Sequence, residues 1–138
     1  MTIANQRMIV SGTLDNTGTY MPSIYIASPA DTPIPWITPN DGYTYTVTGV
    51  SAYWTTADSS GTPTVQVRRM QGVEAVASGD ALLSAAIDLT GTAETVVNGS
   101  LVTGDALTLA AGDRLGVDVI DAVTEAAGLT VAVTIAKT

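Results

Sequence analysis

The fold class of this chain is decided by one stretch, Leu107-Thr108-Leu109-Ala110-Ala111-Gly112-Asp113-Arg114-Leu115-Gly116-Val117-Asp118-Val119. Leu107 and Leu109 alternate with polar or small residues, and the alternation resumes from Leu115 after a short polar break. Apolar runs of period two on either side of a Gly-Asp tip predict two antiparallel strands joined by a tight connection. Arg114 and Asp118 are then expected on the solvated face.

The same alternation recurs upstream. Tyr43, Tyr45 and Val47 share one parity, and the residues from Val50 to Trp54 share the other. The change falls at Gly49, which predicts either a β-bulge or two short strands that meet at a corner. After the polar loop 58–63, the segment 65–68 alternates again and predicts the return strand of a hairpin.

The C-terminal part contains the clearest strand. Residues 83–89 and 96–102 alternate weakly around a turn at 90–92, whereas residues 129–136 alternate without a break. A strand of the second kind has one buried face and one polar or small-residue face. The residues predicted to be buried are Leu115, Val117, Leu129, Val131, Val133 and Ile135.

Composition agrees with an all-β domain. The chain has 138 residues, of which 46% are hydrophobic and 13% charged, with 13 glycines and no phenylalanine. Such a mixture of Val, Ala, Thr and Gly favours strands and turns over helices. About eight to ten short strands, separated by turns, predict an antiparallel β-sandwich of the jelly-roll type over residues 41–138, in a chain that forms a single domain overall.

Residues 1–40 are expected to form a Pro-rich arm with edge strands. They contain five of the six prolines, and proline removes a donor from the strand ladder. Met8–Val10 and Ile24–Ile26 are the expected strands, and Thr32–Trp36 is expected to be extended. Such a segment either wraps its own domain or reaches a neighbour, and we expect the second for part of it.

Charge and residue usage exclude several functions. The net charge is −8, which disfavours binding to nucleic acid phosphates and suits a partner with a basic patch. The chain has no histidine and no cysteine, so catalytic triads, thiol chemistry and His- or Cys-ligated metals are excluded. No apolar segment is long enough to span a membrane, and the first residues lack the blocks of a signal peptide.

Only carboxylates remain as candidates for acid–base chemistry. Asp113, Asp118 and Asp121 lie close in sequence, and oxygen ligands suit Ca²⁺. Their spacing matches no known calcium loop, so solvated strand faces and turns are the better explanation. We therefore assign no catalytic residue, no metal and no cofactor, and we expect no enzymatic activity.

A few side chains are better candidates for contacts with a partner. Trp54 ends an alternating strand and is expected in the core, whereas Trp36 is flanked by Pro35 and Ile37 and is a candidate for an interface or for simple packing. Alternation places Arg68 outside and Arg69 inward or at a strand end. Arg69 then pairs with an acid across a subunit contact or in a rim salt bridge. The candidate interface residues are Pro33, Pro35, Trp36, Ile37 and Arg69.

One short motif is repeated. Gly79-Asp80-Ala81-Leu82 recurs as Gly104-Asp105-Ala106-Leu107. Two copies without wider similarity predict repeated turn chemistry and not a solenoid, which needs three or more repeats.

The chain from about Tyr43 to its end resembles the small all-β structural proteins of tailed bacteriophages, especially capsid decoration (cement) proteins and related head-fibre or tail modules. The segments that carry the resemblance are 47–54, 79–83, 107–119 and 128–135. The resemblance implies a jelly-roll-like fold, a homotrimer, and binding to the major capsid protein on the capsid exterior, with no functional residue to transfer. Two alternatives remain: a carbohydrate- or receptor-binding module of a tail or fibre, and a hydrolase that uses only carboxylates.

Overall fold

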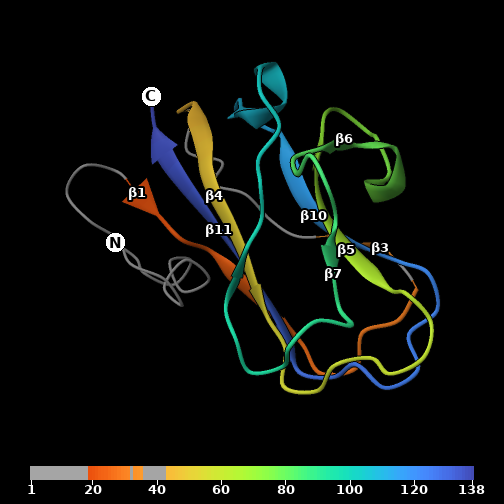
Figure 1. Ribbon diagram of the computed structural model, residues 1–138. Coiled ribbons are helices and arrows are strands. Elements are labelled where there is room, and N and C mark those ends of the chain that lie inside the picture. The colour runs from red at the N-terminus through yellow and green to blue at the C-terminus, as the bar shows by residue number, and fades with distance from the viewer. Residues whose placement is uncertain (1–18, 32, 36–42) are drawn as a thin grey trace.

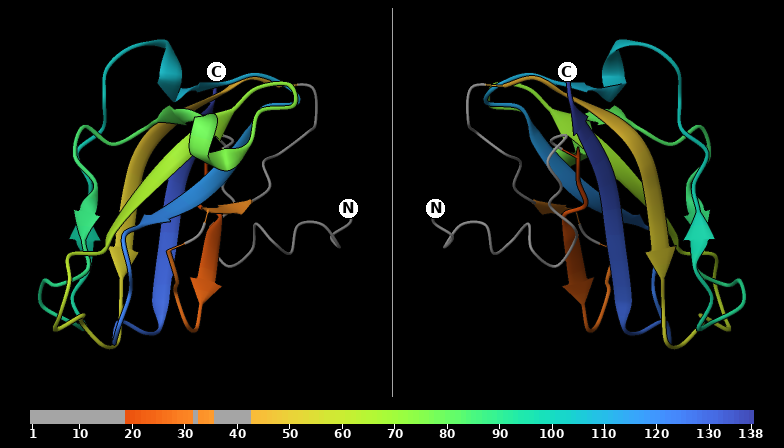
Figure 2. Two further views of the ribbon diagram at one scale, coloured as in Figure 1. Left: turned by 90° about the vertical axis from the view of Figure 1, so that its right-hand side faces the viewer. Right: turned by 90° about the vertical axis from the view of Figure 1, so that its left-hand side faces the viewer.

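The structure is a computed structural model, and it describes residues 19–31, 33–35 and 43–138. Two antiparallel β-sheets pack face to face as a β-sandwich (Figures 1 and 2), as the sequence predicts. The regular structure in these ranges is completed by two short 3₁₀ turns, η1 (Val76–Ser78) and η2 (Asp105–Leu107). No helix in the described ranges has the length and apolar character needed to cross a membrane.

The first sheet, called sheet A, is built on the two longest strands in the described ranges. These are β4 and β11, which run side by side in every view of the ribbon (Figures 1 and 2). The six strands of sheet A are β1 (Thr19–Tyr20), β2 (Ser23–Ile26), β4 (Tyr45–Tyr53), β8 (Val97–Asn98), β9 (Thr108–Leu109) and β11 (Leu129–Lys137).

The second sheet, called sheet B, has β5 and β10 at its centre. β10 pairs with β5 on one side and with β3 on the other, and β5 pairs further with β6 and β7. The five strands of sheet B are β3 (Pro33–Pro35), β5 (Thr64–Met70), β6 (Asp80–Ala81), β7 (Ile87–Asp88) and β10 (Arg114–Ile120).

The order of the strands is that of a jelly roll. β1 and β2 both pair with β11, β8 and β9 both pair with β4, and β6 and β7 both pair with β5. Three pairs of short strands therefore share a position, which reduces the eleven strands of the described ranges to eight positions. If the eight positions are numbered along the chain, their spatial order across sheet A is 1, 8, 3, 6 and across sheet B is 2, 7, 4, 5. This is the strand order of a jelly roll.

The core lies between the two sheets. Residues Leu115, Val117, Leu129, Val131, Val133 and Ile135 are all fully buried there, which confirms the predicted inward face. Trp54 is buried as well, as predicted. Each fully buried Val, Leu or Ile side chain contributes about 1.5–3 kcal/mol relative to an exposed one, so these strands supply much of the stabilising free energy.

Two connections predicted as hairpins are wrong. β9 belongs to sheet A and β10 to sheet B, so the stretch 107–119 crosses from one sheet to the other. The strands 45–53 and 64–70 are related in the same way. Alternation predicts which side chains of a strand are buried, but it does not predict which strand pairs with which. The apolar faces of two strands are equally buried when the strands are neighbours in one sheet and when they face each other across the core.

The turn within the stretch 107–119 is made by its Gly-Asp tip, as expected. Gly112 has φ +90°, a backbone conformation that residues with a side chain rarely adopt. Asp113 is buried, its backbone N–H donates to the Ala110 carbonyl at 3.0 Å, and its carboxylate accepts the Ala110 N–H at 2.9 Å. The tip is therefore a closed turn that redirects the chain into sheet B.

The outer face of sheet B is not the solvated face that the sequence predicts. Asp118 points outward but is only 7% exposed, and Arg114 is half-buried. The segment that includes η1 covers part of this face and places Val76 against it. A Cβ atom on Gly116 would lie 2.7 Å from Val76 Cγ1, so glycine at this position is what allows the cover to approach.

One of the two strands expected before residue 40 is present, and so is the expected extended segment. β2 contains Ile24–Ile26 as predicted, and β3 is the extended segment 33–35 at the edge of sheet B. Both pair with strands of this same chain, so this part of the Pro-rich region wraps its own domain. The predicted strand Met8–Val10 lies outside the described residues.

The parity change at Gly49 is a β-bulge. Gly49 pairs with Thr134 and Val47 pairs with Ile135, which leaves Thr48 as the extra residue on β4. This confirms the first of the two predicted explanations, because β4 continues through the irregularity as one strand of nine residues.

Candidate functional site

Arg69 is the centre of a buried polar cluster. Its side chain is 10% exposed and lies on the core side of β5, inward as predicted. Nη1 donates to the carbonyls of Asp105 and Thr108, both at 2.8 Å, and Nη2 contacts the carboxylate of Asp80 at 2.6 Å. Arg69 therefore ties the end of β5 in sheet B to η2 and β9, which lead into sheet A.

The two copies of the Gly-Asp-Ala-Leu motif meet at this arginine. The first copy supplies Asp80 from strand β6, and the second supplies the Asp105 carbonyl from η2. The copies differ in conformation, since Gly104 has φ +104° and Gly79 has φ −72°. The two copies therefore form different local structures, a strand after Gly79 and a 3₁₀ turn after Gly104, so the predicted repetition of turn chemistry is wrong and the motif is not a duplicated unit.

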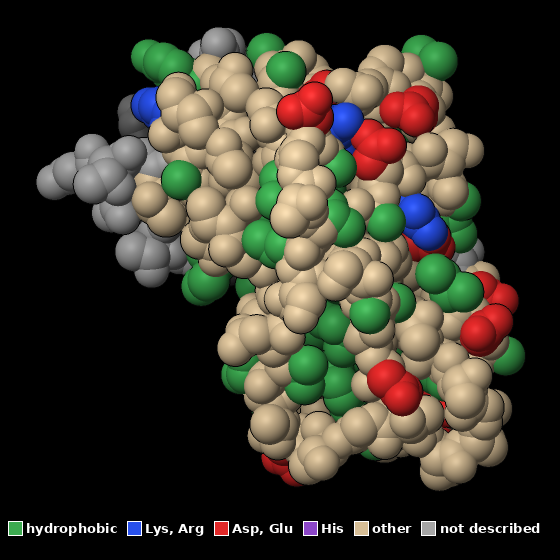
Figure 3. All heavy atoms as spheres, turned by 45° about the horizontal axis from the view of Figure 1, so that its top comes forward, with side chains coloured by type: hydrophobic (Ala, Val, Ile, Leu, Met, Phe, Trp, Pro, Cys, Tyr) green, Lys and Arg blue, Asp and Glu red, His purple; other side chains and the backbone are tan. Residues whose placement is uncertain are grey.

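The remaining arginines that the structure describes are also bound within the chain. Arg68 Nε donates to Asp118 Oδ2 at 2.8 Å, and Arg114 Nη2 donates to the carbonyls of Gly72 and Glu74. Figure 3 shows the consequence on one face: the Lys and Arg side chains on its right-hand half lie beside acidic ones. These arginines therefore hold segments of the chain together.

Asp58 makes a second polar cluster at the loop end of the sandwich. It is 3% exposed, and its Oδ1 accepts the backbone N–H groups of Glu125 at 2.7 Å, Thr124 at 2.8 Å and Ala126 at 3.1 Å. Neighbouring hydroxyl groups extend the contact, because Ser59 bonds to Glu125 and Ser60 to Thr124. The carboxylate thus joins the loop after β4 to the loop after β10.

These hydrogen bonds hold the pKa of Asp58 below its usual value. The Glu125 N–H is the largest cause, burial acts in the opposite direction, and the groups of Ala126 and Thr124 add to the lowering, so the pKa falls from 3.8 to about 2. Donors that bind the ionised form favour it over the protonated form. Asp58 therefore stays ionised at any pH near neutral and has the character of a structural anion.

Acid is expected to weaken the protein through this group. A carboxylate whose folded pKa is lowered stabilises the fold above its unfolded pKa, and this contribution is lost as pH falls through the folded value of about 2. Asp58→Asn is expected to be less stable than the parent near neutral pH and to approach it between pH 3.8 and about 2. Urea unfolding across this pH range measures both curves, and a constant difference between them would contradict the assignment.

The aspartates considered as calcium ligands do not form a site. The Asp113 carboxylate caps its own turn, Asp118 is paired with Arg68, and Asp121 is exposed. Within the described ranges, no group of three or more acidic residues is placed to hold a metal ion. The structure therefore brings none of these three residues together.

The aromatic residues divide between core and surface. The indole N–H of Trp54 donates to the Gly91 carbonyl at 3.3 Å, which satisfies its one donor inside the core. Tyr25 is 65% exposed on β2, and the Lys137 ammonium lies 3.9 Å from the ring centroid of Tyr43. Trp36 and Ile37 lie outside the described residues.

The proposed interface residues are placed only in part. Pro33 is exposed on the edge strand β3, and Pro35 of the same strand pairs with Gly116 of β10. Arg69 is bound by groups of its own chain, so its own donors are directed inward. The role of the five residues at an interface stays a prediction.

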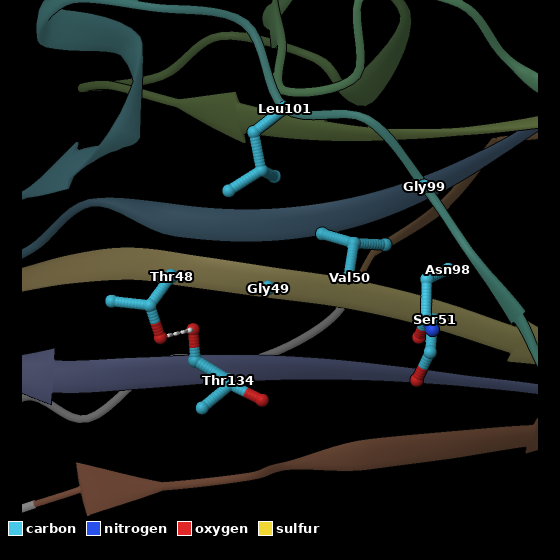
Figure 4. Close-up of a pocket in the computed structure, with 8 residues that line it drawn as sticks. All are labelled: Thr48, Gly49, Val50, Ser51, Asn98, Gly99, Leu101 and Thr134. Atoms are coloured by element: carbon cyan, nitrogen blue, oxygen red, sulfur yellow. Dashed lines mark hydrogen bonds between the residues drawn. The ribbon is translucent and has the colours of Figure 1, made fainter.

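A pocket opens on sheet A beside the bulge (Figure 4). Its volume is about 430 Å³. It lies along the edge of β4 between the part of that strand that pairs with β8 and the part that pairs with β9. Hydroxyl and amide groups line it from Thr48, Ser51, Asn98 and Thr134, with Val50 and Leu101 as apolar contacts and two glycines completing the wall.

Sequence reasoning missed both Asp58 and this pocket. Asp58 stands in a loop whose composition predicts exposure, and nothing local reports that residues 124–126 will present three N–H groups to it. The pocket did have a signal in the parity change at Gly49, because bulges redirect side chains and often border functional sites.

The comparisons with known proteins give little. No family model matches the sequence, and no curated protein matches it. A solved structure described by the words "Bacillus endospore appendages form a novel family of disulfide-linked pili" is similar at a TM-score of 0.35, with 12% identity over 91% of this chain and 93% of that chain. A similarity of this size carries no argument about function.

Proposed function

We propose that the protein is a structural component of a virus particle that decorates the outside of the capsid and ties neighbouring major-capsid subunits together as a homotrimer. The observation that carries the proposal is the jelly-roll strand order of the two sheets. This fold is used repeatedly in viral capsid proteins, although lectin-like and enzyme domains share it. Because one fold hosts many functions, the further support comes from the residues.

The state of the buried acids supports a non-catalytic role. Asp58, Asp113 and Asp118 each accept hydrogen bonds or an ion pair from their own chain. A hydrolase that uses only carboxylates needs an acid and a base that face a substrate across a cleft. In the described part of the chain these three carboxylates instead join loops and strands, which suits a rigid scaffold.

Rigidity and charge support binding to a shell. A preordered sandwich loses little entropy when it binds, and proline residues at positions 35 and 39 restrict the backbone of the sequence around Trp36. Trp36 and Ile37 would anchor this segment as buried apolar contacts. The net charge of −8 would meet basic patches on the shell, and a trimer would match local threefold positions of an icosahedral lattice.

The carbohydrate- or receptor-binding module of a tail or fibre remains the second candidate. Exposed coplanar aromatic side chains in a groove would favour it. The pocket on sheet A has no aromatic platform of the kind that gives tight carbohydrate binding, so we rank a module whose main role is glycan or receptor binding below decoration of the capsid.

The test is made on particles. Capsids that lack this protein are expected to assemble but to break at a lower temperature or under milder osmotic shock, and purified protein is expected to rebind and restore them. Sedimentation of the purified chain should give the mass of a trimer. Depleted particles of unchanged robustness, or protein found only at a tail tip that holds a glycan, would rule out the proposed role.

The anchor residue gives a sharper version of the same test. Trp36→Ala is expected to weaken rebinding to depleted particles about thirtyfold, because a buried aromatic anchor contributes about 2 kcal/mol or more. Tyr25→Ala, which removes an exposed ring from β2, is the matched control and should rebind like the parent. If the two variants rebind equally well, Trp36 is not the anchor. Thermal unfolding checks that both variants are folded.

A further inference from the structure

The pocket at the bulge of β4 has the composition of a site for an uncharged polar ligand. None of the residues that line it is ionisable. A charged ligand would lose hydration there without meeting an opposite charge, and an anion would in addition be repelled by the net charge of −8. The ligand class that fits is therefore neutral.

The hydrogen-bonding groups of the pocket stand in two pairs (Figure 4). Thr48 and Thr134 lie at one end and Ser51 and Asn98 at the other, with Gly49 between them. Thr48 Oγ1 donates to the Thr134 carbonyl at 3.4 Å, whereas the structure gives the side chains of Ser51 and Asn98 no partner within the ranges it describes. Hydroxyl and amide groups both donate and accept hydrogen bonds. Ser51 and Asn98 can therefore bind ligand hydroxyls that donate as well as those that accept.

The room between the two pairs exists because residue 49 is glycine. A Cβ atom built there would make only ordinary contacts, 3.7 Å from Thr134 Cβ and Oγ1. Alanine is therefore tolerated sterically at this position but would project into the space between the pairs. The pocket volume of about 430 Å³ falls in the lower part of the range of small-molecule sites, about 300–1,000 Å³.

An apolar surface completes the site. The Leu101 side chain is half-buried and points toward the space above β4, beside Val50 (Figure 4). A pyranose ring presents hydroxyl groups at its rim and C–H groups on its faces, so it can bond to the polar pairs while a face packs on Leu101.

We infer that this pocket is a binding site for a neutral sugar of pyranose size, held by Ser51 and Asn98 on one side and by Thr48 and Thr134 on the other. This inference does not rest on the capsid role proposed above, because every residue that lines the pocket belongs to a single chain and no capsid subunit is needed to form it. On a particle that carries many copies, a weak site of this kind would be strengthened by multivalency.

The test is a titration of the ¹⁵N-labelled full chain followed by NMR. Glucose, galactose, mannose and N-acetylglucosamine are added to millimolar concentrations, with glucuronate as the anionic counterpart of glucose. At least one neutral sugar is expected to give saturating shifts centred on residues 48–51 and 98–101, and glucuronate is expected to give none. Absence of saturation for all four neutral sugars, or equal shifts with glucuronate, would overturn the inference.

Variants locate the site. Asn98→Ala removes an amide, and Gly49→Ala fills the space without a steric clash. Each is expected to raise the dissociation constant at least about tenfold, which corresponds to 1.4 kcal/mol. Ser28→Ala, outside the pocket, is the control for a lost side-chain group and should bind like the parent. Parent-like binding by both pocket variants would place the sugar elsewhere.

Discussion

Val131→Asp is expected to lower the free energy of unfolding by about 3–5 kcal/mol, the largest effect among the substitutions considered. Val131 is 0% exposed on β11, between Ile24 of β2 and Ala52 of β4. A carboxylate at this position would be buried without a counter-charge or a donor. Urea unfolding at neutral pH measures the loss.

The neighbouring position provides the control. Ala132 is the next residue on the same strand and is partly exposed on the opposite face. Ala132→Asp carries the same charge and the same low strand propensity, so it should cost about 1 kcal/mol at most. Equal losses for the two variants would mean that strand propensity and not burial sets the effect, and a stable Val131→Asp protein would mean that the faces of β11 are reversed.

Arg69→Met is expected to lower the free energy of unfolding by about 2–4 kcal/mol. Methionine preserves most of the apolar stem but leaves the Asp105 and Thr108 carbonyls without the donor that each now has at 2.8 Å. It also disconnects β5 from η2, so sheets A and B lose a link at one end of the sandwich. Chemical unfolding of parent and variant measures the loss.

A second variant separates the carbonyl contacts from the ion pair. The Asp80 side chain is 49% exposed, so water can replace the guanidinium around it, and exposed pairs contribute little. Asp80→Asn is therefore expected to cost less than about 1 kcal/mol. If it costs as much as Arg69→Met, the ion pair and not the backbone carbonyls accounts for the role of Arg69.

The part of this cluster that could be predicted is its direction. Val65 and Val67 set the inward parity of β5, and Arg69 shares it. Its partners could not be predicted, because the two carbonyls come from positions 36 and 39 residues along the chain, and a carbonyl has no sequence signature. For the same reason the three N–H groups that bind Asp58 left no trace in the composition of either loop.

The pocket shows a similar division. The parity change at Gly49 predicted an irregularity in the strand, and the structure confirms a β-bulge there. That the edge of β4 would pair with β8 at Ser51 and with β9 at Thr46, leaving a space between, depends on how the segment 97–109 is routed. The path of this segment depends on its contacts with the rest of the sandwich, and the sequence of the segment alone does not determine it.

The sequence by itself determined the long strands, 45–53, 64–70, 114–120 and 129–137, and the side of each that faces the core. Period-two alternation is a local property of the backbone, because successive side chains of a strand point to opposite faces. Only the tertiary structure decided which strands pair. β9 and β10 flank a tight turn yet enter different sheets, because the apolar faces of two strands are equally buried beside each other or across a core. The choice between the two is made by the long-range partners β4, β5 and β11, which complete the jelly roll.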